Sequence, residues 1–469
     1  MRISVSPGIF SAYIAMKPLA LKLIPLALAT LFAMAPVCRA YSLLTHEQLI
    51  DLTWHDSIVP LILSRYPGLT PAQLDRARSY AYGGCVIQDI GYYPFGDRDF
   101  SNLTHYVRSG DFVVNLFRNA KNADELAFAI GALSHYIGDS YGHSEATNRA
   151  VPVEFPTLEA RYGPVVSYAE GQHQHVQTEF AFDIDQIAHQ HLAPLRYLRH
   201  IGLNVPAHQL GLAFYQTYGL TDFADHRAHR FKVKEYRFAV RTFIPRIAYA
   251  VTLLRRKHEP GEPDTPEATE IDKEALDAAT LDNWNLYRTG KPSLETRILA
   301  VLLFILPKVG PLSLVNVKGP TTGTEADYLH SVSQSTAALR YALRSFTPVA
   351  SRIAVPQGAA VLERPFGPRD LHHPLPNRDL DTGYVVKPGG YSLTDSTYAS
   401  LLHRLAQNPA QPIPPGIKRD IETYYSDPSA PITTKQHPAQ WAEVQADLKT
   451  LATIPTSNEP EPYPTYDSQ

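Results

Sequence analysis

Histidine and acidic residues recur at a fixed spacing within residues 131–146, GALSHYIGDSYGHSEA. His135 and Asp139 are four residues apart, and His143 follows four residues after Asp139. On an α-helix this spacing places side chains on one face, one turn above another. Zinc takes both imidazole and carboxylate ligands in proteins. A metal-ion site is therefore the first chemistry that this sequence suggests.

The stretch that carries His135 and Asp139 is predicted to be a buried helix over residues 122–141. Apolar residues recur on one side at steps of three and four, namely Leu126, Ile130, Leu133 and Ile137. Phe128 and Ala132 lie beside the polar pair, so both sides of the helix are apolar, which is typical of a core helix. A His and an Asp buried there need an ion pair, hydrogen bonds or a metal ion.

A second pair with the same spacing, His175 and Glu179, lies on a helix predicted around 168–191. A catalytic zinc ion uses such ligands and keeps one position for water. A lone histidine is usually an ordinary core or surface residue, but two such pairs with His143 between them favour a metal site. Further candidates from other parts of the chain are His46, Asp89 and His105.

Rival ligands lie near two of these positions, namely His173 beside His175, and Asp97 and Asp99 after Asp89. His173 is disfavoured because the residue four positions later is Gln177, a poor zinc ligand. We expect the remaining histidines to be ordinary core or surface residues, among them His189, His191, His226 and His229.

The ordered set of these candidates resembles the zinc-dependent phospholipase C superfamily. The set is His46, Asp89, His105, His135, Asp139, His143, His175 and Glu179. The superfamily also includes the fungal single-strand nucleases and the catalytic domain of glycosylphosphatidylinositol phospholipase D. The resemblance covers residues 41–179 and extends at most to 256. It implies an all-α fold, a helical bundle built around a trinuclear zinc site.

The resemblance also implies a role for each candidate. His105, His135 and Asp139 would hold one zinc ion, and His143, His175 and Glu179 a second. His46, Asp139 and the mature amino terminus at Tyr41 would hold the third, so that Asp139 bridges two ions. Asp89 takes the place of the carboxylate that orients or deprotonates the attacking water, whose pKa a bound zinc ion lowers toward about 7.

Two features depart from the bacterial phosphatidylcholine-specific enzymes and the nucleases. Those proteins begin with Trp where this chain has Tyr41, and they have a longer spacer between the bridging Asp and the next His. The shorter spacer between Asp139 and His143 is similar to that of the glycosylphosphatidylinositol-specific branch. These differences disfavour a nuclease and leave the head group open.

Residues 1–40 are predicted to be a secretory signal peptide. They carry four basic residues and no acidic one, and residues 23–35 are almost entirely apolar. Cleavage after Ala40 would export the chain to the periplasm or the extracellular space, starting at Tyr41. The alternatives are a start at Met16 and a lipidated Cys38.

The composition of the mature chain limits its function and its stabilisation. It holds 39 basic and 46 acidic residues, a net charge of about −7, which argues against a general nucleic-acid binder. Its single cysteine, Cys85, excludes an internal disulfide. An exported chain of this kind is held together by its core or by metal.

The sequence pattern predicts mostly α-helices before residue 259, and one further helix after it. We expect helices over 45–58, with Thr45 as N-cap, and over 75–87, 229–256 and 325–344. The Gly- and Pro-containing residues 89–96 are predicted to form a loop that ends over 101–105. Aromatic residues of this loop, Tyr92, Tyr93 and Phe95, either line a substrate mouth or pack in the core.

We divide the chain into residues 1–40 (signal peptide), 41–258 (catalytic domain), 259–295 (linker region), 296–455 (C-terminal extension) and 456–469 (disordered tail). The extension is predicted to be mixed in structure and is rich in proline, with 17 of the 39 prolines after residue 350. Its apolar stretch 297–317 is either a membrane span or a core helix, and its prolines and lysine favour the core helix.

The sequence thus predicts a secreted zinc-dependent phosphodiesterase, a phospholipase C with Zn²⁺ as cofactor. Its substrate is expected to be a phospholipid, which the enzyme could bind at a membrane surface, or another phosphodiester. Nucleic acid is not the expected substrate. One alternative is a single-strand nuclease of the same fold. The other is a non-catalytic metal-binding surface protein.

Overall fold

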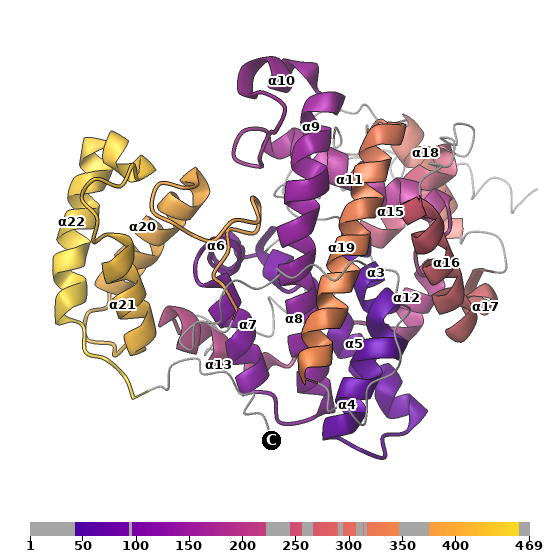
Figure 1. Cartoon of the computed structure of the whole chain (residues 1–469), viewed down its shortest axis with the longest axis horizontal. Helices are drawn as coiled ribbons and strands as arrows, with labels where there is room; N and C mark the ends of the chain where they lie inside the picture. Colours follow the sequence, from indigo (N-terminus) through magenta and orange to yellow (C-terminus); the bar gives the residue numbers. More distant parts are fainter. Residues whose placement is uncertain are drawn as a thin grey trace, which may run out of the picture.

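The computed structural model describes residues 43–92, 96–221, 244–255, 266–288, 294–305, 313, 317–346 and 375–458. These residues form α-helices joined by short turns, with a few 3₁₀ and π segments (Figure 1). Within these ranges the only β pairing is at two isolated bridges, Arg378–Val385 and Ile413–Thr456. The predicted all-α fold is therefore confirmed, and the described part of the C-terminal extension forms helices except over residues 317–321 and 375–391 and in the segments between its later helices.

The helices up to residue 255 are α3 (Leu43–Thr53), α4 (Val59–Arg65), α5 (Pro71–Gly84), α6 (Arg98–Tyr106), α7 (Ser109–Arg118), α8 (Ala123–Tyr141), α9 (Asn148–Glu154), α10 (Pro156–Tyr162), α11 (Gln172–Ala188), α12 (Leu195–Ile201), α13 (Ala207–Tyr218) and α15 (Ile244–Arg255). The π segments η1 (Trp54–Ile58) and η3 (Gly142–Thr147) and the 3₁₀ turn η2 (Gln88–Tyr92) interrupt them. The later helices are α16 (Pro266–Leu281), α17 (Trp284–Arg288), α18 (Leu294–Ile305), α19 (Thr322–Phe346), α20 (Ser392–Ala406), α21 (Pro415–Tyr424) and α22 (Pro438–Thr453), with the 3₁₀ turn η7 (Thr433–Gln436).

Helix α8 is the predicted buried helix, and it runs through the middle of the molecule beside α19 (Figure 1). Asn122 begins it as N-cap, because its side chain accepts a hydrogen bond from the Glu125 N–H. Glycines let α5 approach closely: a Cβ at Gly131 would lie 2.2 Å from the Ala81 carbonyl oxygen, and one at Gly84 2.0 Å from that of Phe128. The two backbones therefore touch, which brings the end of α5 next to His135.

The start of α3 differs from the prediction that Thr45 is its N-cap. Helix α3 already includes Leu43, and Thr45 lies inside its first turn. The Asp183 carboxylate on α11 accepts hydrogen bonds from the Leu44 N–H (3.0 Å), the Thr45 N–H (3.1 Å) and the Thr45 hydroxyl (2.8 Å). The first-turn donors are thus satisfied by a residue 138 positions away, which local sequence signals do not reveal.

Two further boundaries also differ. Residues 101–105 are not the end of a loop but belong to α6, for which the Asp97 side chain is N-cap through the Asp99 N–H. Helix α5 begins at Pro71 rather than near 75, because Thr70 and Gln73 form a reciprocal capping box. The α6 boundary matters most, since it places His105 in the last turn of a helix.

The later part of the chain packs on the same core as the earlier part. Buried residues of α19 and α20, such as Leu339 and Leu401, belong to the cluster that contains the apolar face of α8. The predicted linker region 259–295 contains α16 and α17, whose buried residues include Ile271 and Trp284. Figure 1 shows α20 to α22 at one end of the molecule and α15 to α18 at the other.

Several sequence predictions fall on other parts of the chain. The signal peptide, Tyr41, Tyr93, Phe95 and residues 459–469 of the predicted tail lie outside the described residues. The domain boundaries and the disorder of the tail stay predictions. In the apolar stretch 297–317 the structure describes α18, which ends at Ile305, and no helix among the described residues is long and apolar enough to cross a membrane.

Candidate metal centre

Eight of the nine predicted site residues meet in the core, and they come from six elements. They are His46 on α3, Asp89 on η2, His105 on α6, His135 and Asp139 on α8, His143 on η3, and His175 and Glu179 on α11. Each of these side chains is at most 2% exposed to solvent. The ninth residue is Tyr41.

Asp139 lies at the centre of the first group. Its Oδ2 is 3.1 Å from His135 Nε2 and 3.3 Å from His105 Nε2. Its Oδ1 is 3.2 Å from His46 Nε2. The two oxygens therefore face different histidines, as a carboxylate that bridges two metal ions would.

The second group consists of His143, His175 and Glu179. His175 Nδ1 is 2.8 Å from Glu179 Oε1, as expected for residues one helical turn apart, and His143 Nδ1 is 3.9 Å from the same oxygen. His143 Nε2 also lies 3.8 Å from Asp139 Oδ1. The two groups are thus neighbours within one continuous polar cluster.

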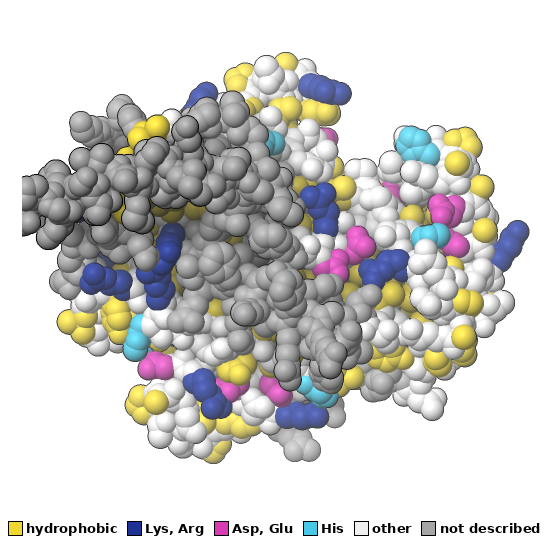
Figure 2. Space-filling view, turned by 180° about the vertical axis from the view of Figure 1, so that it is seen from behind, with side chains coloured by type: hydrophobic (Ala, Val, Ile, Leu, Met, Phe, Trp, Pro, Cys, Tyr) yellow, Lys and Arg dark blue, Asp and Glu magenta, His cyan; other side chains and the backbone are white. Residues whose placement is uncertain are grey.

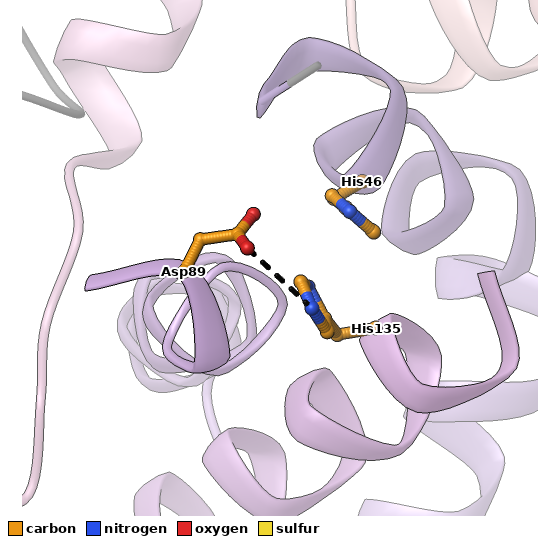
Figure 3. Close-up of side chains that lie close together, drawn as sticks. All are labelled: His46, Asp89 and His135. Carbon is orange, nitrogen blue, oxygen red and sulfur yellow. Dashed lines mark ion pairs between the residues drawn. The ribbon is translucent and has the colours of Figure 1, made fainter. Parts of the chain in front are cut away.

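Asp89 faces the first group from the turn after α5, and Figure 3 shows it with His46 and His135. Its Oδ1 is 3.3 Å from His105 Nε2 and 3.9 Å from His135 Nε2. Both of its oxygens are buried and accept no hydrogen bond from the described residues. This geometry suits the water-orienting carboxylate that the resemblance implies, and it equally suits a metal ligand.

Backbone carbonyls set the tautomers of two histidines. His135 Nδ1 is 2.9 Å from the Cys85 carbonyl oxygen, and His105 Nδ1 is 2.8 Å from that of Ser101. A carbonyl only accepts, so each Nδ1 carries a proton and donates it. Nε2 of each ring therefore faces Asp89 and Asp139, and on binding a metal ion it would lose its proton and donate its lone pair, which is the arrangement of a metal-binding imidazole.

The electrostatics of the cluster favour a bound cation. Burial alone would raise the pKa of Asp139, but His135, His105 and His46 hold that pKa well below its ordinary value. Burial, together with the nearby carboxylates of Asp139 and Asp89, raises the pKa of Glu179 well above its ordinary value. Both oxygens of Asp139 and Oε1 of Glu179 are buried without a hydrogen bond in the described part of the chain. A divalent cation would supply the compensating charge and the missing contacts, so these residues fit zinc.

A segment far along the chain supports this cluster. We call residues 375–391 the C-terminal strap. Its Asp381 carbonyl accepts a hydrogen bond from the Asn148 side chain (2.8 Å), and Asn148 Oδ1 is 2.8 Å from His175 Nε2. The Leu380 N–H donates to the carbonyl of His105 (3.1 Å). The strap thus contacts one predicted ligand directly and a second through Asn148.

Buried polar contacts hold the strap in place. Asp381 Oδ2 accepts hydrogen bonds from the hydroxyls of Tyr106 and Tyr391, each at 2.8 Å. Asp379 accepts from the Asp381 and Thr382 N–H groups and from the Thr394 hydroxyl. Burial and the charge of Asp381 raise the pKa of Asp379 well above its ordinary value. Sequence reasoning missed Asn148 and Asp381, because nothing local links them to a histidine.

The aromatic loop residue Tyr92 packs rather than lining a mouth. Its side chain is fully buried, its ring lies 5.3 Å from that of His105, and its hydroxyl donates to Asn102 Oδ1 (3.2 Å). The alternative ligand candidates His173 and Asp97 are engaged in contacts outside the cluster. His173 contacts Ser313 (2.9 Å), and Asp97 caps α6.

An all-helical fold around a buried cluster of histidines and carboxylates defines a class of metal-dependent hydrolases. Comparison with known families agrees, since residues 45–227 match the family described as zinc dependent phospholipase C. The resemblance to this superfamily is thereby confirmed over the matched residues. No curated protein and no solved structure matches the chain. The family match therefore indicates that this part of the chain is a zinc-dependent hydrolase of the phospholipase type.

Proposed function

We propose that this protein is a secreted zinc-dependent phosphodiesterase, a phospholipase C that hydrolyses the head-group phosphodiester of a phospholipid. The observation that carries the proposal is the buried cluster around Asp139, where three histidine nitrogens lie within 3.3 Å of one carboxylate. The family match over residues 45–227 supports the same chemistry. The charge and apolar pattern of residues 1–40 supports export to the periplasm or the extracellular space.

The ligand sets that we propose are those that the resemblance implies, and the first two coincide with groups of side chains that lie close together in the structure. His105, His135 and Asp139 would hold one zinc ion, and His143, His175 and Glu179 a second. His46, Asp139 and the amino terminus at Tyr41 would hold a third. Bound zinc would supply the positive charge that neutralises a phosphodiester and activates water for attack.

The chain's own groups then have separate tasks. Asp89 would orient the attacking water or accept its proton at a carboxylate oxygen, since its Oδ1 faces His105 and His135 and both of its oxygens are buried. The Cys85 and Ser101 carbonyls fix the orientation of the two imidazoles, with a proton on each Nδ1 and each Nε2 facing the cluster. The side-chain oxygen of Asn148 orients His175 in the same way, by accepting a hydrogen bond from its Nε2. The C-terminal strap in turn holds Asn148 through the Asp381 carbonyl.

The single-strand nuclease is the second candidate, and the surface charge does not favour it. A nuclease needs cationic contacts along a nucleic-acid backbone. On the face in Figure 2, basic side chains are scattered among acidic ones over the described atoms. The mature chain also carries a net charge of about −7.

The test pairs elemental analysis of the mature protein with two hydrolysis assays, on phospholipid vesicles and on single-stranded DNA. We expect about three zinc ions per chain, release of the phosphorylated head group, and loss of activity on chelation. Less than one zinc ion per chain would refute the metal centre. Hydrolysis of DNA but not of phospholipid would show that the protein is a single-strand nuclease. Bound zinc without hydrolysis of either substrate would show that it is a non-catalytic metal-binding protein.

A further inference from the structure

A third group of potential ligands lies at the far end of α11, apart from the centre described above. Asp185 and His189 are one helical turn apart, and Glu325 in the first turn of α19 faces them. His189 Nδ1 is 3.3 Å from Asp185 Oδ2 and 4.0 Å from Glu325 Oε1. Asp185 lies six residues beyond Glu179 on α11, about 9 Å along the helix axis. The group is therefore separate from the catalytic cluster.

The two acidic side chains are buried, while the histidine reaches the surface. Asp185 is 4% exposed, Glu325 2% and His189 12%. Asp185 Oδ2 and His189 Nδ1 are buried and face each other as an ion pair at 3.3 Å, and neither atom has another hydrogen-bond partner in the described part of the chain. One imidazole nitrogen and two carboxylates whose ligand atoms lie within 4.8 Å of one another, in a mostly buried place, are a set of donor atoms that can hold a cation.

The neighbouring histidine His191 has partners outside this group. The ring of His191 stacks on that of His189 with centroids 5.6 Å apart. His191 Nδ1 is 2.9 Å from Gln186 Oε1, and its Nε2 is 3.0 Å from Asp272 Oδ1. His191 is thus a neighbour of the group with partners of its own, and it serves as a matched control.

We propose that Asp185, His189 and Glu325 form a separate binding site for a divalent transition-metal cation of the zinc type, which joins α11 to α19. One imidazole and two carboxylates are a ligand set that zinc accepts, and three protein ligands leave a position for water. The site would tie α19, which lies beyond the family match, to a helix of the catalytic domain. Its role is structural, since it is separate from the residues assigned to hydrolysis.

A proton competes with the cation for this site. Hydrogen bonding to Asp185 raises the pKa of His189 to about 9, so without metal the ring is an imidazolium between two carboxylates. A divalent cation would displace that proton and leave the group neutral overall. Zinc binding here therefore releases one proton.

The experiment counts zinc in the full mature chain after saturation and removal of free metal. After saturation we expect the wild type to hold one zinc ion more than the three proposed for the catalytic cluster, and His189→Gln and Glu325→Gln each to lack that additional ion. His191→Gln should hold the wild-type number. Zinc should also raise the melting temperature of the wild type and of His191→Gln by more than that of the two site variants.

Equal zinc content in the wild type and in both site variants would overturn the proposal, and the group would then be a proton-bound ion pair. Using two substitutions keeps the test decisive if one variant fails to fold. The zinc difference does not depend on hydrolysis. All three variants should retain the activity of the wild type, so failure here is distinguishable from failure of the proposed function.

Discussion

The matched residues 45–227 and the C-terminal strap contribute different things to the same centre. The matched part holds every described ligand candidate, on α3, η2, α6, α8, η3 and α11. The strap offers none of them, but it hydrogen-bonds to Asn148 and to the backbone of His105. Its own carboxylates, Asp379 and Asp381, are engaged by tyrosine and threonine hydroxyls and by backbone N–H groups.

This difference shows that candidate metal ligands and the residues that hydrogen-bond to them need not lie in the same part of a chain. Groups that hydrogen-bond to metal ligands typically change metal affinity by about 10–100-fold when they are removed. The strap reaches the site through contacts between residues more than 200 positions apart, such as Asn148 and Asp381. The contacts that support the candidate metal centre therefore include residues beyond the part of the chain that matches the family.

The largest effect is expected inside the matched part. Asp139→Asn should lose zinc and all measurable hydrolysis, because both oxygens of Asp139 face histidines of the cluster. Asp89→Asn should keep the zinc and the fold but lower turnover by about 10²–10⁴-fold, as expected for a residue that orients water. Zinc content by elemental analysis and rates on phospholipid distinguish the two. Equal zinc loss in both variants would make Asp89 a ligand.

The next largest effect is expected from blocking the amino terminus at Tyr41, which precedes the matched residues and is the proposed ligand of the third zinc ion. A free α-amine has an unperturbed pKa near 8 and can bind a cation after losing its proton. A protein that begins Met-Ala-Tyr41 should fold, keep the two zinc ions that do not need the terminus, and lose most of its activity. It is compared with protein processed to start at Tyr41. If the two match in zinc content and rate, the terminus is not a ligand and the third zinc ion must be withdrawn.

A smaller effect is expected at the strap. Gly383 has a φ of +72°, and a Cβ there would lie 2.4 Å from the carbonyl oxygen of Ser140, next to Asp139. Gly383→Ala should displace the strap and weaken zinc binding by about 10–100-fold. Gly68→Ala is the control, since Gly68 has a φ of +81° with no atom within 4 Å of the added Cβ. Titration with a competing chelator measures the affinity, and equal affinities in both variants would show that the strap only packs.

The smallest effect concerns Asp183, which caps α3 from within the matched part. Asp183→Ala removes the acceptor of three hydrogen bonds at the start of the helix that carries His46. Loss of an N-cap typically lowers the free energy of unfolding by about 0.5–2 kcal/mol. Denaturant unfolding of the zinc-loaded protein measures this. An unchanged midpoint would mean that other groups satisfy the first turn.

The sequence by itself determined the helical class and the ligand pairs that lie on one helix. His135 with Asp139, and His175 with Glu179, follow from four-residue spacing, which α8 and α11 realise directly. The ordered set of site residues also identified the family, which the match over residues 45–227 confirms. Such signals are readable because helical periodicity and ligand order are properties of short stretches and of chain order.

Only the tertiary structure decided which helices meet and what supports their ligands. It placed His105 on α6, replaced Thr45 by Asp183 as the cap of α3, and joined Asp381 to His175 through Asn148. It also brought Glu325 on α19 close to Asp185 and to His189, a residue that the sequence alone indicates only as a core or surface histidine. These contacts join residues from about 30 to more than 200 positions apart. Their formation depends on how the helices pack, and no local pattern in either partner encodes it.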